Sequence, residues 1–128
     1  MEIKIIVPDG MFYDGVCDFI EFTSVSGRMG VYEEHIPMTT ILEPCVVNIK
    51  NGSEGVKAAV LGGFVEIQKH SIIMLAEDAN WPDEIDIERA KAAKERAEHR
   101  LQTKSKDTDM LRAEAALKRA MARISVLK

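Results

Sequence analysis

The sequence predicts an α+β protein, in which an N-terminal antiparallel β-sandwich, residues 1–82, is followed by a C-terminal antiparallel two-helix hairpin, residues 83–128. Three observations predict this division. All 8 glycines and all 4 prolines lie at or before Pro82. Apolar residues form short runs before this point and repeat every three or four positions after it. The charge changes sign there: residues 1–82 carry 5 basic and 12 acidic side chains (−7), and residues 83–128 carry 12 and 9 (+3).

Short apolar segments in the first part are predicted as strands, and they are residues 2–5, 18–22, 46–50, 60–61, 64–67 and 72–75. The dipeptide Asn51-Gly52 is typical of a tight hairpin, and Pro44 and Gly62-Gly63 are turn signals between segments. The continuous apolar run 72–75 predicts a strand that is buried on both faces. Several short strands at this spacing are typical of a sandwich or barrel.

The last third of the chain predicts two helices. Asp86 can accept hydrogen bonds from the free N–H groups of a first turn, so we expect a helix from there to about Lys104. Residues 103–107 are polar, and Asp107 or Thr108 can cap a second helix that runs close to the end of the chain. Each helix has one narrow apolar stripe: Ala90, Ala93, Ala97 and Leu101 in the first, and Ala113, Leu117, Ala120, Ile124 and Leu127 in the second. Small side chains and a short connection predict closely packed, antiparallel helices.

This hairpin is expected to be only marginally stable by itself. At roughly 25 cal/mol per Å2 of buried apolar surface, two narrow alanine stripes barely offset the entropy of ordering the chain. We therefore expect the hairpin to need a docking partner and to move between positions.

The sequence contains no motif of a catalytic or metal centre. It has no phosphate-binding loop and no nucleophile elbow, and its three histidines have no paired spacing with each other or with cysteine. Cys17 and Cys45 are expected as free, buried thiols. No apolar run reaches the roughly 18 residues of a membrane-spanning helix, and no signal peptide pattern is present, which predicts a protein kept in the cytosol.

Two sets of arginines share one spacing of 7 and then 4 residues, and they are Arg89, Arg96 and Arg100 in the first helix and Arg112, Arg119 and Arg123 in the second. Each set lies on one helical face, where guanidinium groups suit a nucleotide triphosphate or an acidic segment of a partner. A solvated face balanced by pairs such as Glu114 with Lys118 is the alternative, and spacing alone favours it. Asp86 and Arg89 form a second candidate, because Asp86 can accept from a ligand amine or hydroxyl, although a plain helix cap explains Asp86 equally well.

Five motifs together resemble those of one known family. They are residues 5–10, 26–30 with 35–37, 62–67, 85–97 and 112–121, which read IIVPDG, SGRMG with HIP, GGFVEI, IDIERAKAAKERA and RAEAALKRAM. Over essentially the whole chain they resemble the epsilon subunit of bacterial F-type ATP synthases. The resemblance implies a non-catalytic subunit of the central stalk, whose sandwich lies against the gamma subunit and the c-ring. It also implies a hairpin that folds onto the sandwich or extends along gamma and inhibits ATP hydrolysis.

The resemblance implies three sets of site residues. A regulatory ATP site would consist of Ile85, Asp86, Arg89, Ala90, Arg96, Arg100 and Arg112. Contact with the c-ring would involve Arg28, Met29, Gly30 and His35. Inhibitory contact with the catalytic beta subunit would involve Arg112, Arg119 and Arg123. The chain departs from the family pattern at Asn80, where ATP-binding relatives carry an acidic residue, at Arg28, where an acidic residue is common, and at Glu33-Glu34, where Pro-Gly is usual.

The resemblance also implies partners and a location. Gamma, the c-ring and the beta subunit are the expected partners, and the expected position is peripheral, on the cytoplasmic face of the bacterial plasma membrane, through the complex alone. No cofactor is required, and ATP is expected only as a regulatory ligand. A free-standing adenine-nucleotide sensor is the alternative function. Nucleic-acid binding is not favoured, because the chain is acidic overall and no aromatic platform accompanies the arginines.

Overall fold

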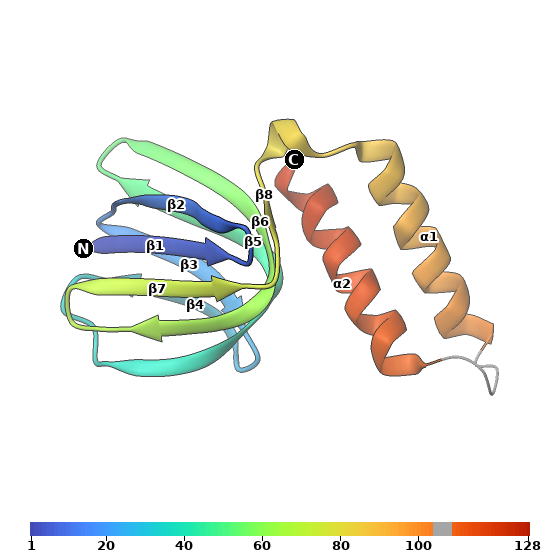
Figure 1. Cartoon of the computed structure of the whole chain (residues 1–128), viewed down its shortest axis with the longest axis horizontal. Helices are drawn as coiled ribbons and strands as arrows, with labels where there is room; N and C mark the ends of the chain where they lie inside the picture. Colours follow the sequence, from blue (N-terminus) through green and yellow to red (C-terminus); the bar gives the residue numbers. More distant parts are fainter. Residues whose placement is uncertain (104–108) are drawn as a thin grey trace.

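The computed structural model describes residues 1–103 and 109–128, and Figure 1 shows the strands on one side and the helices on the other. The strands are β1 (Glu2–Val7), β2 (Gly10–Val16), β3 (Phe19–Ser24), β4 (Gly27–Tyr32), β5 (Met38–Asn51), β6 (Glu54–Ile67), β7 (Ser71–Ala76) and β8 (Ala79–Asn80). The helices are η1, a single 3-10 turn (Pro82–Glu84), α1 (Ile87–Thr103) and α2 (Met110–Val126). The predicted order, a strand region followed by two helices, is confirmed.

The described strands form the sandwich as one hydrogen-bonded path in the order β2-β1-β7-β6-β5-β3-β4, with β8 beside β6. Neighbouring strands are antiparallel, as predicted, except for β1 and β7, which run parallel. The parallel pair joins the N-terminal hairpin to the edge of the later strands. It therefore connects two parts of the domain that lie about 70 residues apart in the chain.

The strands β5 and β6 are long enough to belong to both layers, because each has 14 residues. Pro44 and Gly62-Gly63 lie inside them and do not end them, so residues 60–61 and 64–67 form one strand and not the two that we predicted. The φ angles of +92° at Gly62 and +130° at Gly63 are accessible to glycine and strained for other residues. Figure 1 shows both strands curving in this part of the sandwich, so these turn residues bend the strands from one layer into the other.

The main core lies between the two layers. Its largest fully buried side chains include Phe22, Ile3, Ile5, Ile20, Ile67, Ile72 and Met74. Cys17 and Cys45 are free and buried, as predicted, and burial raises the pKa of both thiols. The prediction that residues 72–75 are buried on both faces is wrong, because Leu75 is 52% exposed while Ile72 and Met74 are fully buried. On the outer face of β7, Leu75 is exposed, and Ser71 and Ile73 are intermediate in burial.

The hairpin helices begin at carboxylate caps. Asp86 Oδ1 accepts a hydrogen bond from the backbone N–H of Arg89 at 3.2 Å, as the sequence predicted. At the start of α2 the cap is Asp109, whose Oδ1 accepts from the N–H of Arg112 at 3.1 Å. The predicted alternatives, Asp107 and Thr108, lie outside the described residues, as does the predicted helix end at Lys104.

Two apolar faces of α2 organise the hairpin. The predicted alanine stripes are buried in it at Ala90, Ala97, Ala113 and Ala120. A second face of α2, which we did not predict, carries Ala122 and Val126 and packs against Ala59 and Leu61 of β6. Accordingly α2 lies between α1 and the sandwich (Figure 1).

We predict that Gly63→Ala destabilises the sandwich by more than about 3 kcal/mol, because a Cβ there would lie 2.0 Å from the carbonyl oxygen of Leu75 at a φ of +130°. Denaturant unfolding followed by circular dichroism measures the effect. Gly55→Ala in the same strand is the control, since its nearest contact would be at 3.6 Å, and it should change stability by less than about 1 kcal/mol. Equal stabilities of the two variants would contradict the tight bend.

Candidate functional site

The linker between sandwich and hairpin is held in place by aromatic packing. The ring of Trp81 stacks on Phe12, with centroids 4.5 Å apart, and meets Tyr13 edge-on at 5.8 Å. The backbone N–H of Trp81 donates to Glu84 Oε1 at 2.8 Å, and Asn80 pairs with Ala59 in the sheet. The start of α1 is therefore positioned by the sandwich.

The hairpin docks on the sandwich over a small surface. Besides the apolar contact of α2 with β6, Lys118 Nζ lies 3.2 Å from Glu43 Oε2. Arg123 of α2 reaches β8, where its Nε donates to Asn80 Oδ1 at 2.9 Å. Its Nη2 also lies 3.5 Å from Asp78 Oδ2. Partly exposed ion pairs contribute only about 0–1 kcal/mol each, so these pairs add little to the apolar contact.

A cavity of about 470 Å3 lies at the junction of the linker, α1 and α2. Five of the residues predicted for the ATP site line it, and they are Ile85, Asp86, Arg89, Ala90 and Arg96. The other lining residues are Asp78, Asn80, Glu84, Ala93 and Arg123. The volume is within the range of small-molecule sites, about 300–1,000 Å3.

The cavity combines three arginines and three carboxylates with polar and apolar groups. Across residues 1–103 and 109–128, Arg89 and Arg96 form no ion pair, whereas Arg123 is held by Asn80 and Asp78. Guanidinium groups beside the N-terminus of a helix favour a phosphorylated ligand. Asp86 and Asn80 offer acceptors for an amine or hydroxyl, and Ile85, Ala90 and Ala93 offer apolar surface for a ring.

Two residues predicted for the ATP site lie elsewhere. Arg100 is exposed in the last turn of α1. It lies 11 residues, or about 16 Å along the helix axis, from Arg89. Arg112 is exposed in the first turn of α2, and Arg119 lies half-buried at its middle. Sequence reasoning did not place Arg123 at this cavity. In an antiparallel hairpin of two helices with equal length, the last turn of α2 lies beside the first turn of α1. This pairing could have placed Arg123 at the cavity from the sequence alone.

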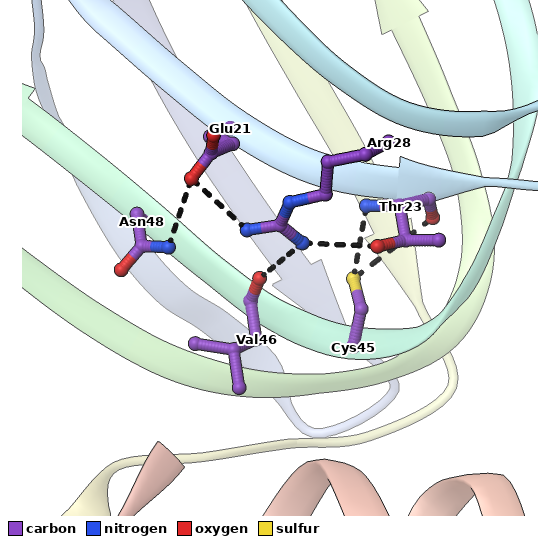
Figure 2. Close-up of polar contacts among 6 residues, drawn as sticks. All are labelled: Glu21, Thr23, Arg28, Cys45, Val46 and Asn48. Atoms are coloured by element: carbon purple, nitrogen blue, oxygen red, sulfur yellow. Dashed lines mark hydrogen bonds and ion pairs between the residues drawn. The ribbon is translucent and has the colours of Figure 1, made fainter. Parts of the chain in front are cut away.

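The four residues predicted for the c-ring contact do not form one surface. Arg28 lies on strand β4, where its Nη1 donates to Thr23 Oγ1 at 2.9 Å and to the carbonyl oxygen of Val46 at 3.0 Å. Its Nη2 donates to Glu21 Oε1 at 3.2 Å, and Asn48 donates to the same oxygen (Figure 2). The guanidinium group is thus engaged within the sandwich, beside a groove of about 350 Å3 that also borders Lys118 and other residues of α2.

The other three residues differ in position and packing. Met29 packs partly against the main core, and a Cβ at Gly30 would lie 2.8 Å from the ring of Phe19. His35 is in the loop between β4 and β5, where the N–H of Glu34 donates to the carbonyl oxygen of Lys69 at 2.9 Å. His35 therefore lies near the β6–β7 turn, away from α2.

Neither a metal cluster nor a membrane-spanning helix occurs among the residues that the structure describes. No three His, Cys, Asp or Glu side chains there are grouped to hold a metal ion. None of the described helices has the length and apolar character needed to cross a membrane.

The fold and the site define a two-domain chain, a β-sandwich with a helical hairpin docked beside a cavity that is lined by three arginines and three carboxylates. Residues 1–82 match the family model of the ATP synthase delta/epsilon chain, beta-sandwich domain, and residues 83–128 match that of its long alpha-helix domain. The chain belongs to the ATP synthase delta/epsilon chain family.

Similar proteins cover nearly the full length. The ATP synthase epsilon chain of Halalkalibacterium halodurans is 42% identical, covering 98% of this chain and 96% of the relative. That of Caldanaerobacter subterraneus subsp. tengcongensis is 39% identical, with 97% and 91% covered. Among solved structures, a chain of the Euglena gracilis mitochondrial ATP synthase matches in fold, with a TM-score of 0.82 at 20% identity, covering 98% of this chain and 80% of that one.

We predict that Val126→Asp releases the hairpin from the sandwich, because it places a charge in the apolar contact with Ala59 and Leu61. Amides of α1 and α2 should exchange hydrogen more than about tenfold faster, while those of the main core stay protected. Leu127→Asp, at a neighbouring position that is 38% exposed, is the control and should change little. Unchanged exchange in α2 of Val126→Asp would contradict the docking contact.

Proposed function

We propose that this chain is a non-catalytic regulatory subunit of the central stalk of an F-type ATP synthase. The observation that carries the proposal is that both of its domains match the delta/epsilon family and that relatives about 40% identical are epsilon chains. The sandwich, residues 1–82, binds the gamma subunit and the c-ring. The chain lies peripherally on the cytoplasmic face of the bacterial plasma membrane and is associated with the membrane only through the complex. A free-standing nucleotide sensor is less favoured, because the match extends over both domains.

The hairpin, residues 83–128, acts as the regulatory element. Its apolar contact with the sandwich is a cluster of four buried residues separate from the main core, which supports this role, because a few kcal/mol decide between docked and released positions. In the released position, Arg112, Arg119 and Arg123 contact acidic segments of the catalytic beta subunit and inhibit ATP hydrolysis. Arg123 is then the residue that changes partners, since in the docked position Asn80 and Asp78 hold it.

The cavity holds ATP as a regulatory ligand. Arg89, Arg96 and Arg123 receive the phosphates, and Asp86 with Asn80 receives polar groups of the nucleoside. Because these groups come from the linker, α1 and α2, a bound ligand joins all three elements. ATP therefore stabilises the docked hairpin by RT ln(1 + [ATP]/Kd).

Removal of residues 83–128 is predicted to raise ATP hydrolysis by the assembled enzyme at low ATP concentration, because the inhibitory element is lost. Steady-state hydrolysis by enzyme reconstituted with the truncated chain, compared with the full chain, measures this. Co-purification with gamma verifies that the truncated chain still assembles. Equal hydrolysis rates in two fully assembled enzymes would contradict the inhibitory role.

Calorimetric titration of the isolated chain with ATP tests the cavity. Arg89→Ala and Arg123→Ala are each predicted to weaken ATP binding about tenfold or more, because each removes a charged donor to phosphate. Lys91→Ala removes a positive charge from an exposed site on α1 outside the cavity and should bind as the wild type does. Arg100→Ala is expected to have a smaller effect than Arg89→Ala, because of its distance along α1. Identical affinities of Arg89→Ala and Lys91→Ala would refute this assignment.

A further inference from the structure

The turn between β5 and β6 carries the one Asn-Gly pair of the sequence, Asn51-Gly52. Asparagine is among the thermolabile residues of proteins, because the backbone nitrogen of the next residue can attack its side-chain amide. Glycine hinders this attack least, since it has no side chain. The other two asparagines precede bulky residues, with isoleucine after Asn48 and tryptophan after Asn80. Asn51 is therefore the asparagine of this chain that is chemically most open to deamidation.

The folded hairpin holds Asn51 and Gly52 away from that reaction. Asn51 is the last residue of β5 and pairs with Glu54 across the turn. The backbone N–H of Gly52 donates to Asp18 Oδ2 at 2.8 Å, although the two residues are 34 positions apart in the chain. Asp18 is itself positioned by its backbone N–H, which donates to the carbonyl oxygen of Lys50 at 2.9 Å. A side chain from outside the hairpin thus holds the hydrogen of the attacking nitrogen.

Water reaches this corner of the molecule freely. Asn51, Gly52 and Asp18 are all exposed, and Figure 1 shows the green tip of the β5–β6 hairpin at the end of the sandwich away from the helices. The backbone of Gly52 has a φ of +64°, which glycine adopts without strain. The reaction at Asn51 is therefore limited by the geometry of the turn and not by access to water.

We propose that Asn51 is the deamidation site of this chain and that Asp18 controls the reaction by holding the N–H of Gly52. Ring closure requires the nitrogen of Gly52 to turn toward the side chain of Asn51 and to lose its proton. The turn breaks the hydrogen bond to Asp18, and an ionised carboxylate is an acceptor that stabilises this N–H in place. The proposal does not depend on the proposed function, because it concerns the chemistry of the folded chain alone.

The reaction has two steps and needs only water as a co-reactant. In the first step, the nitrogen of Gly52 bonds to Cγ of Asn51, the bond from Cγ to the side-chain nitrogen breaks, and that nitrogen leaves as ammonia with the proton of Gly52. The product is a five-membered succinimide ring. In the second step, water adds to one of the two ring carbonyl carbons and opens the ring. Opening at Cγ gives aspartate, and opening at the backbone carbonyl gives isoaspartate.

Either product weakens the turn that restrained the reaction. It places a carboxylate opposite Glu54 and beside the residue that Asp18 holds, and like charges directly opposite each other destabilise a strand pair. Isoaspartate also adds a carbon to the backbone, which disturbs the register at the turn. Deamidation therefore opens the tip of the β5–β6 hairpin. The contact of α2 with Ala59 and Leu61 lies further along β6 and stays intact.

The test incubates the full chain, folded and in urea, and follows the peptide that contains residue 51 by mass spectrometry. Folded Asp18→Ala should deamidate about fivefold faster than the wild type or more, which is the factor that one ordinary hydrogen bond contributes. In urea the two chains should react equally fast, because the hydrogen bond is absent from both. Asp14→Ala, which removes an exposed carboxylate in the middle of β2, is the matched control and should react as the wild type does.

A second variant separates the hydrogen bond from general loss of structure. Asp18→Asn keeps an acceptor oxygen and should deamidate at Asn51 close to the wild-type rate, and circular dichroism confirms that each variant is folded. Equal rates for folded wild type and Asp18→Ala would overturn the role of Asp18. A slower reaction in Asp18→Ala would overturn it too, because the carboxylate would then promote the attack. Faster deamidation at Asn48 or Asn80 than at Asn51 would overturn the assignment of the site.

Hydrogen exchange of Asn51→Asp tests the consequence for the fold. Amides of residues 48–56 should exchange faster than in the wild type, while those of α1 and α2 keep their protection. Unchanged exchange at the turn would contradict the opening of the hairpin tip.

Discussion

The bend of β6 at Gly62-Gly63 is the constraint on which the rest of the molecule depends. Before the bend, β6 pairs with β5 and β8 and turns Ala59 and Leu61 toward α2. After the bend it pairs with β5 and β7 and turns Phe64 to the other outer face. No residue with a Cβ fits at Gly63, where the backbone of Leu75 is too close. This one strand thus positions both layers of the sandwich. It also positions the surface on which the hairpin docks and the linker that leads to the cavity.

The hairpin docks on the sandwich next to the cavity, so docking and ligand binding are coupled. The contact of α2 with the sandwich has a small apolar surface and two partly exposed ion pairs, so no single term holds it firmly. A bound ligand or a competing protein surface contributes a few kcal/mol at ordinary concentrations. Either one can therefore shift the equilibrium between the docked and the released hairpin. Arg123 is central to this competition, because it belongs to α2, bonds to the linker and faces the cavity.

Local patterns predicted more than long-range ones did. The Gly and Pro boundary, the tight turn at Asn51-Gly52 and the cap at Asp86 are local features, and the structure confirms the two unlike regions, the β5–β6 hairpin and the helix cap. Pro44 and Gly62-Gly63 were wrongly predicted as turns between strands, because proline and glycine occur both in turns and at bends within a strand. Five of the ten residues that line the cavity were identified, all in the stretch 85–96 at the start of α1, whereas Arg123 depends on how two helices pair.

The apolar run 72–75 gave a wrong prediction for an informative reason. Its two-sided apolar pattern is typical of a strand covered on both faces, and the isolated chain covers only one. A sequence records the environment in which a protein works, including surfaces that bury only in an assembly. Of the two apolar outer surfaces, the one under α2 is covered within the chain by that helix. The other has no cover among the described residues, and a chain that belongs to a family of complex subunits has the partners to supply it.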